Sequence, residues 1–311
     1  MNRIILALPI LPALAGAMIA DLAQAGELEP RMLPEKTRFV AHVDFEALVR
    51  MKAFRAIEEH VLEDLDADEE FMQEMTRLGI DFRKDLKSAT VFGEDEEHGT
   101  VVFVTSDKLD TALDRARDEV QFHKHSVDGL ELISVDDADD GFMYVMSRNE
   151  GSERVVFASD NARSVVQAVR VYQGKARSLA DASEPAISAN PAKNSVLFVS
   201  AGGLDSLSDL GPASHIASKA SSFVLDLGER SALMFLRLSA QTNSPKDAKD
   251  LKAIVDGLRA IMTLTGGDDL PEFVMELMNS VQLEVLGSEV ILSIELDVTD
   301  MLEQIEDLQE F

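Results

Sequence analysis

The amino-acid sequence predicts an α+β protein whose antiparallel sheets are built from hairpins, with helices packed on one face. Three observations predict this class. Short runs that alternate apolar and polar residues come in pairs around turn signals, amphipathic helical stripes separate the pairs, and the whole pattern restarts near residue 191. Paired short strands imply antiparallel pairing, and helices between the pairs imply α+β rather than all-β.

The first half opens with a strand over 37–45, where apolar and polar residues alternate. A helix over 45–65 follows, because its apolar residues recur at spacings of three and four, and a second short helix ends at Gly79. The remaining elements are a hairpin over 89–106, a helix over 107–120, a hairpin over 120–135 that turns at Asp128-Gly129, a hairpin over 141–159, and a helix over 160–174 that Asp160 caps and Gly174 ends.

Residues 175–193 are rich in Ala, Ser and Pro and indicate a connector. After it, a strand following Pro-x-Lys, a hairpin over 221–238, a helix over 245–264, a hairpin over 281–296 that matches 120–135, and a closing helix over 298–308 repeat the earlier order. We interpret this as an internal duplication, with residues 26–190 as the first half and 191–311 as the second. The alternative is that any α+β chain yields such a resemblance between its halves.

The N-terminus has the three parts of a secretory signal peptide. Arg3 supplies a positive charge, residues 4–20 are uncharged and apolar, and Ala23 and Ala25 form a small-x-small cleavage signature before Gly26. An uncleaved anchor helix is the alternative, although two prolines and a glycine interrupt a run that is short for a hydrocarbon core of about 30 Å. We therefore expect residues 1–25 to be removed, the protein to be exported to the periplasm or beyond the cell, and no membrane span to remain.

Composition excludes several classes of function. The chain has 311 residues, 57 acidic against 29 basic side chains, and a net charge of −28. This charge repels phosphate groups, so we expect no binding to nucleic acid. Cysteine is absent from the sequence, which excludes disulfides, thiolate nucleophiles, cysteine-ligated metals and the lipid-modified cysteine of a bacterial lipoprotein.

Several stretches resemble a known family. "RLGIDFRKDLKSATVFG" over 77–93 and "HKHSVDGLELISVDD" over 123–137, followed by the "RVVFASDNARSVVQAV" strand and helix and by "SLAD", set out turns, caps and strand starts in one order. The chain is similar here to a bacterial exported family of unknown function with duplicated α+β halves, common in planctomycete-like and cyanobacterial proteomes. The likeness covers roughly residues 34–210. It implies an exported, non-catalytic protein, and it supplies no active-site residues.

His123 and His125 form the strongest candidate for a metal site. Side chains on a strand repeat every two residues, so both imidazoles lie on one face of the strand. Two such rings can bind Zn²⁺ or Cu²⁺, but a specific site needs three or four ligands, which His98 or the acidic residues 136–140 would have to supply. The alternative is the solvent face of an edge hairpin.

Other motifs of known chemistry are incomplete. "DDADDG" over 136–141 and "DLDADEEFMQEM" over 64–75 both lack required positions of a calcium loop, which leaves weak binding of divalent cations by solvated acidic loops. The sequence also contains no phosphate-binding glycine loop, no G-x-S-x-G and no H-E-x-x-H. We therefore expect no cofactor.

The apolar stripes of 245–265 and 270–279 have two interpretations. Helical stripes of this kind usually pack inward as core, yet they could line a groove for an apolar ligand. The leading hypothesis is a non-catalytic module that binds an unknown protein or another component of the cell envelope. The alternatives are a carrier of apolar ligands such as lipids, and a hydrolase whose catalytic triad is assembled across space.

Overall fold

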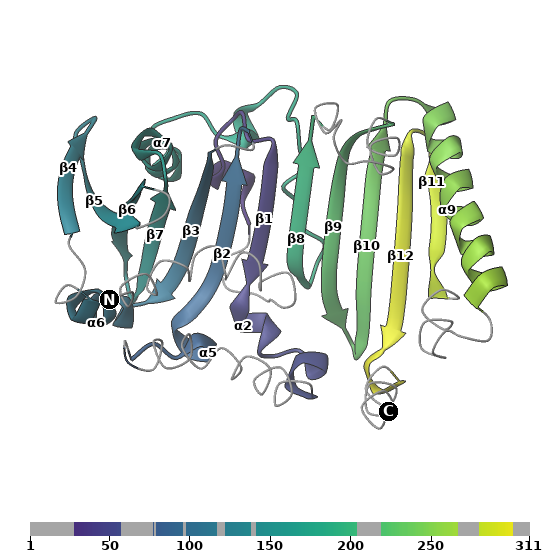
Figure 1. Ribbon diagram of the computed structural model, residues 1–311, viewed down its shortest axis with the longest axis horizontal. Helices are drawn as coiled ribbons and strands as arrows, with labels where there is room; N and C mark the ends of the chain where they lie inside the picture. Colours follow the sequence, from purple (N-terminus) through teal and green to yellow (C-terminus); the bar gives the residue numbers. More distant parts are fainter. Residues whose placement is uncertain are drawn as a thin grey trace. The chain divides into compact units, whose positions relative to one another are not determined.

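A computed structural model shows an α+β chain dominated by antiparallel strands (Figure 1). It describes residues 28–56, 77, 79–95, 98–116, 122–137, 141–203, 219–266 and 280–300. The chain divides into two compact units, Met1–Pro185 and Ala186–Phe311; the two predicted halves meet between residues 190 and 191. The proposed signal peptide, with Ala23, Ala25 and Gly26, lies outside the described residues.

The first unit contains a sheet in which neighbouring strands follow the order β1-β2-β3-β7-β6-β5-β4. Every pair in it is antiparallel. The strands are β1 (Phe39–Asp44), β2 (Leu86–Gly93), β3 (Gly99–Ser106), β4 (Phe122–Val127), β5 (Leu130–Asp137), β6 (Gly141–Glu150) and β7 (Glu153–Ser159). The helices are η3 (Pro30–Met32), α2 (Phe45–Leu48), α5 (Phe82–Asp85), α6 (Lys108–Ala116), α7 (Ala162–Tyr172) and η5 (Leu179–Asp181).

Local chemistry explains where these elements turn and end. Asp128 and Gly129 have φ angles of 51° and 81°, as the predicted two-residue turn between β4 and β5 requires. Helix α7 ends as predicted near Gly174, whose φ of 65° is left-handed. Its start differs from the prediction: Asn161, rather than Asp160, caps the helix, because the Asn161 side chain accepts a hydrogen bond of 2.9 Å from the Arg163 N–H.

The helices of the first unit contact both faces of its sheet. The Tyr172 ring of α7 packs edge-on against Phe157, with 5.5 Å between ring centroids. Arg154 lies on the opposite face of the same strand, because the numbers 154 and 157 differ by an odd number. Its guanidinium donates to Asp110 of α6 at 2.7 Å. The prediction that helices would pack on one face is therefore wrong for this unit, since sequence periodicity gives the apolar stripe of a helix but not the face that receives it.

Two helix predictions in this unit need correction. The helix expected over 45–65 is interrupted, since α2 ends at Leu48 and helical structure resumes at Lys52; residues 57–65 lie outside the described residues. Helix α5 was not expected. Asp81 caps its N-terminus, since the Asp81 side chain accepts a hydrogen bond from the Arg83 N–H at 3.1 Å.

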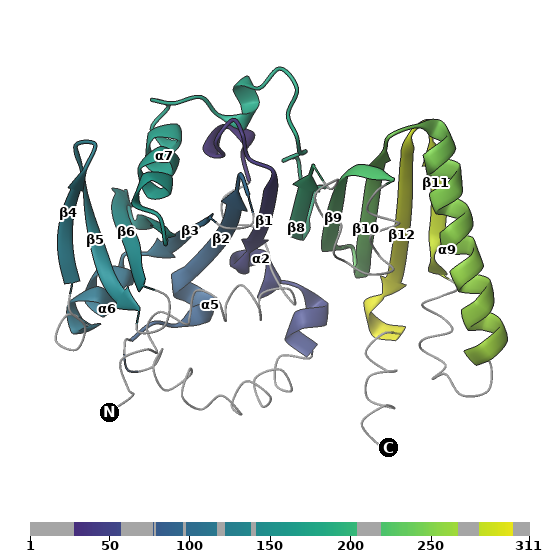
Figure 2. The same ribbon diagram turned by 45° about the horizontal axis from the view of Figure 1, so that its top comes forward.

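The second unit contains a smaller antiparallel sheet in the order β11-β12-β10-β9-β8. One long helix, α9, packs against β10, β11 and β12 (Figure 2). The elements are β8 (Ser195–Gly202), β9 (Ala220–Arg230), β10 (Leu233–Thr242), α9 (Pro245–Gly266), β11 (Gln282–Leu286) and β12 (Glu289–Asp297).

The closing hairpin of the second unit differs from its predicted counterpart. Within each unit the last strand of the sheet in chain order lies beside an earlier hairpin: β7 beside β3, and β12 beside β10. The sequence indicated that β11–β12 corresponds to the 120–135 hairpin (β4–β5). In the strand order, however, β11–β12 occupies the position that β6–β7 occupies in the first unit. Among the described residues, no helix is both long enough and apolar enough to cross a membrane.

Candidate functional site

The predicted histidine pair lies on β4 at the end of the first sheet. His123 is exposed and His125 is half-buried. The Nε2 atom of His125 lies 2.7 Å from the hydroxyl of Ser134, which is fully buried, and its ring meets Tyr144 edge-on at 5.6 Å. One imidazole nitrogen is thus already engaged with a neighbouring strand.

No third ligand joins this pair among the described residues. His98, one suggested partner, lies at the start of β3, and β7, β6 and β5 separate that strand from β4. The described part of the chain contains no group of three or more His, Asp or Glu side chains able to hold a metal ion. The side chains of residues 135–142 lie outside the described set. Metal binding at His123 and His125 therefore stays a prediction.

The hydrolase hypothesis requires a catalytic triad, and the buried polar side chains of β1 and β2 include a histidine that could belong to one. His42 lies opposite Thr90, and Asp44 lies opposite Ser88 on the same face of the sheet. The His42 Nδ1 atom, which a catalytic triad would direct to a carboxylate, is 2.8 Å from the Thr90 hydroxyl. Burial lowers the pKa of His42 to about 4. This arrangement supports a buried polar core and gives the hydrolase no support.

A different surface is prominent in the second unit. Strand registers place sixteen apolar side chains together on one face of its sheet. We call this set the apolar face: Leu197, Val199, Ala201, Phe223, Leu225, Leu227, Met234, Leu236, Leu238, Ala240, Leu283, Val285, Val290, Leu292, Ile294 and Leu296. The opposite face of the same strands carries polar side chains such as Arg237, Gln241 and Glu295 together with buried apolar ones, including Phe198 and Phe235.

The apolar face is only partly covered. Leu197 and Val290 are its two buried members; Leu238 is 37% exposed and the others are half-buried. Helix α9 covers one region, where Ala248 and Leu251 pack with Val290 against Ala240, Leu283 and Val285. Large contiguous apolar surface that remains in contact with water often marks an interaction or ligand-binding site.

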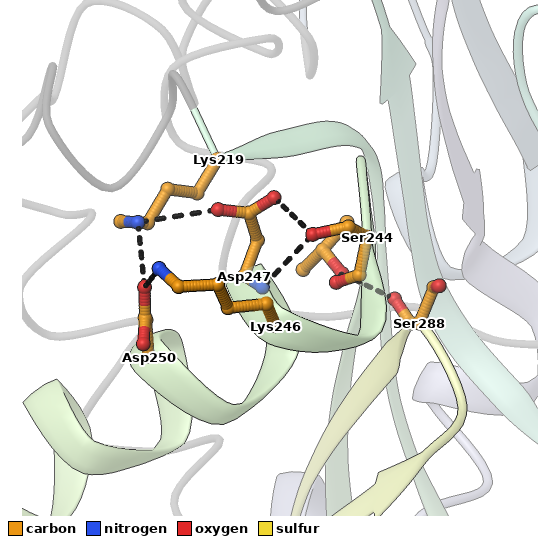
Figure 3. A network of polar contacts seen from close by, with 7 residues as sticks. Lys219, Ser244, Lys246, Asp247, Asp250 and Ser288 are labelled. Atoms are coloured by element: carbon orange, nitrogen blue, oxygen red, sulfur yellow. Dashed lines mark hydrogen bonds and ion pairs between the residues drawn. The ribbon is translucent and has the colours of Figure 1, made fainter.

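The start of α9 is held by a polar network (Figure 3). Lys219, at the beginning of β9, lies 3.3 Å from Asp247 and 3.2 Å from Asp250 of α9. The Ser244 hydroxyl donates to Asp247 Oδ2 at 2.6 Å and accepts from the Asp247 N–H at 3.2 Å, which caps the helix.

Two further features complete the network. The Thr242 N–H and hydroxyl both donate to the Ser288 carbonyl, at 2.8 and 2.6 Å, so the end of β10, just before α9, is bonded to the β11–β12 turn. Bonds to Asp250 and Asp247 raise the pKa of Lys219 above its usual value, and bonds from Ser244 and Lys219 lower the pKa of Asp247. The network is therefore charged at neutral pH.

The sequence also carries a pattern that indicates this surface. The pattern lies in the strands and not in the helical stripes of 245–265 and 270–279. In "FVLDL", "LMFLRLSA" and "VILSIEL" every second residue is apolar, which places all of them on one side of their strands. The helical stripe itself behaves as core at Ala248 and Leu251. Residues 267–279 lie outside the described residues.

Comparisons with known proteins give no assignment. No family model matches the chain, and no curated protein matches it. Solved structures of crystal forms III, I and IV of TP0453 match at 9% sequence identity, with TM-scores of 0.44, 0.39 and 0.43. They cover 91%, 92% and 93% of this chain and 99%, 98% and 99% of the other. At these TM-scores the likeness carries no argument about function.

Proposed function

We propose that this chain is an exported, non-catalytic binding protein of the cell envelope, and that its apolar face receives the aliphatic part of a ligand. The observation that carries the proposal is that all of the sixteen side chains on this side of the sheet except Leu197 and Val290 remain partly exposed. Each apolar Å² removed from water contributes about 25 cal/mol, so covering this surface is favourable.

The composition of the apolar face favours an aliphatic ligand over a protein partner. Protein interfaces concentrate their binding energy in Trp, Tyr and Arg, whereas Leu and Val are under-represented there. Phe223 is the single aromatic residue among the sixteen, and none of their side chains can donate a hydrogen bond. Hydrocarbon chains require no such bonds, which makes an acyl chain the best-matched occupant.

Binding of a neutral aliphatic dye tests the proposal, because the charge of −28 would repel an anionic one. We expect Nile red to bind with increased, blue-shifted emission. Leu238→Asn should weaken binding about fivefold, the equivalent of about 1 kcal/mol for half a leucine side chain.

Leu233→Asn is the matched control for this experiment. Leu233 lies on the same strand with nearly the same exposure, 38% against 37%, but its odd spacing from Leu238 places it on the opposite face. Binding that is absent, or that both substitutions weaken equally, contradicts an aliphatic site on the apolar face. Cross-linking to an envelope protein without dye binding would favour the alternative of a protein partner.

Export rests on the N-terminal sequence. A polar chain begins at Gly26 after the small-x-small signature of Ala23 and Ala25. The intact mass of the protein isolated from its own host should match a chain that starts at Gly26. A mass that includes residues 1–25 would contradict removal of a signal peptide and support an anchor.

We also propose that the two units descend from one duplicated half, as in the exported family that the sequence resembles. The support is the shared order of neighbours, β1-β2-β3-β7-β6 in one unit and β8-β9-β10-β12-β11 in the other, with β4–β5 as an insertion in the first. Crystal structures of the separate units test this: superposition should pair these strands in the same register, and failure to do so would contradict a common origin.

A further inference from the structure

We propose that α9 is a salt-sensitive cover of the apolar face and that Lys219 is the latch that holds it closed. The inference rests on the proposed function, since it concerns access of an aliphatic ligand to the same surface. Lys219 bonds to two aspartates of α9 from outside the helix, whereas Ala248 and Leu251 rest on the part of the apolar face formed by Ala240, Leu283, Val285 and Val290.

Among the side chains of α9 that the structure describes, most of those that hold the helix on the sheet lie in its first two turns. Polar bonds hold Ser244, Asp247 and Asp250, and the buried side chains Ala248 and Leu251 follow directly. Beyond them, Ile254 and Val255 are only half-buried. Arg259 adds a bond of 3.3 Å to the Val281 carbonyl. Weakening the first turn therefore removes a large share of the described contacts that keep the helix on the sheet.

Lys219 differs from the other lysine that shares Asp250. Lys246 lies within α9, bonds to Asp250 at 3.0 Å across one helical turn, and is 83% exposed. Lys219 directly precedes β9, is 19% exposed, and connects the start of that strand to the helix (Figure 3). Loss of Lys246 alters the helix alone, whereas loss of Lys219 breaks a connection between the cover and what it covers.

The size of the effect follows from population-shift arithmetic. A ligand that needs the open form binds with an apparent Kd inversely proportional to the open fraction. Two partly exposed ion pairs contribute modestly, and dissolved salt screens them. Removing them should raise the open fraction about threefold to tenfold, and increased NaCl should have the same effect on the unaltered protein.

The test compares Nile red binding to the full chain and to the variants Lys219→Met and Lys246→Met at low and high NaCl. Methionine keeps the length and apolar character of the lysine stem but removes the charge. We expect Lys219→Met to bind about threefold to tenfold more tightly at low salt and to lose most of its response to NaCl. Lys246→Met should keep the affinity and the salt response of the unaltered protein.

Two results would overturn the latch. One is equal behaviour of the two lysine variants; the other is an unchanged affinity in Lys219→Met whose circular dichroism shows a folded chain. If Lys219→Met unfolds, Asp247→Asn with Asp250→Asn removes the same connection from the helix side and decides the question. Failure of the latch is distinguishable from failure of the proposed function, because Leu238→Asn still weakens dye binding in the first case and no variant binds dye in the second.

Discussion

One face of the sheet in the first unit and one face of the sheet in the second differ in burial and polarity. In the first unit, the face beneath α7 carries buried apolar side chains such as Phe157 and Leu132 together with buried polar ones, including His42 and Ser134. In the second unit, the sixteen side chains of the apolar face are mostly half-buried, and the register places one charged residue, Glu229, beside Met234 on the same side. The first face contains a buried core in which polar groups are hydrogen-bonded, whereas the second leaves most of its apolar side chains half-exposed, as the proposed ligand site requires.

The largest expected effect tests the buried core of the first unit. Phe157→Ala should reduce the free energy of unfolding of the first unit by about 3–5 kcal/mol, since Phe157 is 1% exposed and its loss leaves a cavity. Leu225→Ala, on the apolar face, should cost clearly less, because Leu225 is only half-buried. Urea unfolding followed by circular dichroism measures both; equal costs would remove the distinction between the two faces.

The next largest effect is a dependence of the free energy of unfolding of the first unit on pH. In the folded chain burial lowers the pKa of His42 from 6.5 to about 4, so the unfolded chain binds the proton more readily. The stability supplied by neutral His42 is complete above pH 6.5 and is lost as the pH falls toward 4. The loss should reach about 3 kcal/mol across this interval.

His42→Asn is the comparison for this pH effect, because asparagine can still bond to Thr90 but does not titrate. The variant should lose much less stability than the unaltered chain between pH 6.5 and 4, as measured by urea unfolding at each pH. Parallel pH curves for the two proteins would show that His42 is protonated as easily in the folded as in the unfolded chain.

The smallest expected effect concerns two turns. The β4–β5 turn of the first unit uses Asp128-Gly129, whereas the β9–β10 turn of the second uses Ser231 and Ala232, with φ angles of 52° and 74°. Alanine in a left-handed conformation costs about 1 kcal/mol relative to glycine. Ala232→Gly should therefore raise the stability of the second unit by about that amount in thermal unfolding. Gly129→Ala should lower the stability of the first unit. An unchanged melting temperature in both variants would contradict strain at Ala232.

The sequence determined the local elements because their causes lie within a few residues. Alternation placed the strands, Asp128-Gly129 placed a turn, and Gly174 placed the end of α7, since each depends on backbone geometry that neighbouring residues control. The same alternation marks the sixteen side chains as one-sided. The charge of −28 and the absence of cysteine likewise need no structure to interpret.

Tertiary structure alone decided which elements meet. Alternation is the same for every strand, so it does not specify that β7 lies beside β3, that β12 lies beside β10, or that α6 and α7 contact opposite faces. It also does not place His125 against Ser134, or Lys219 against an aspartate 28 residues later in the chain. These contacts join side chains whose positions depend on the whole sheet, and the half-exposed state of the apolar face depends on which of its neighbours cover it.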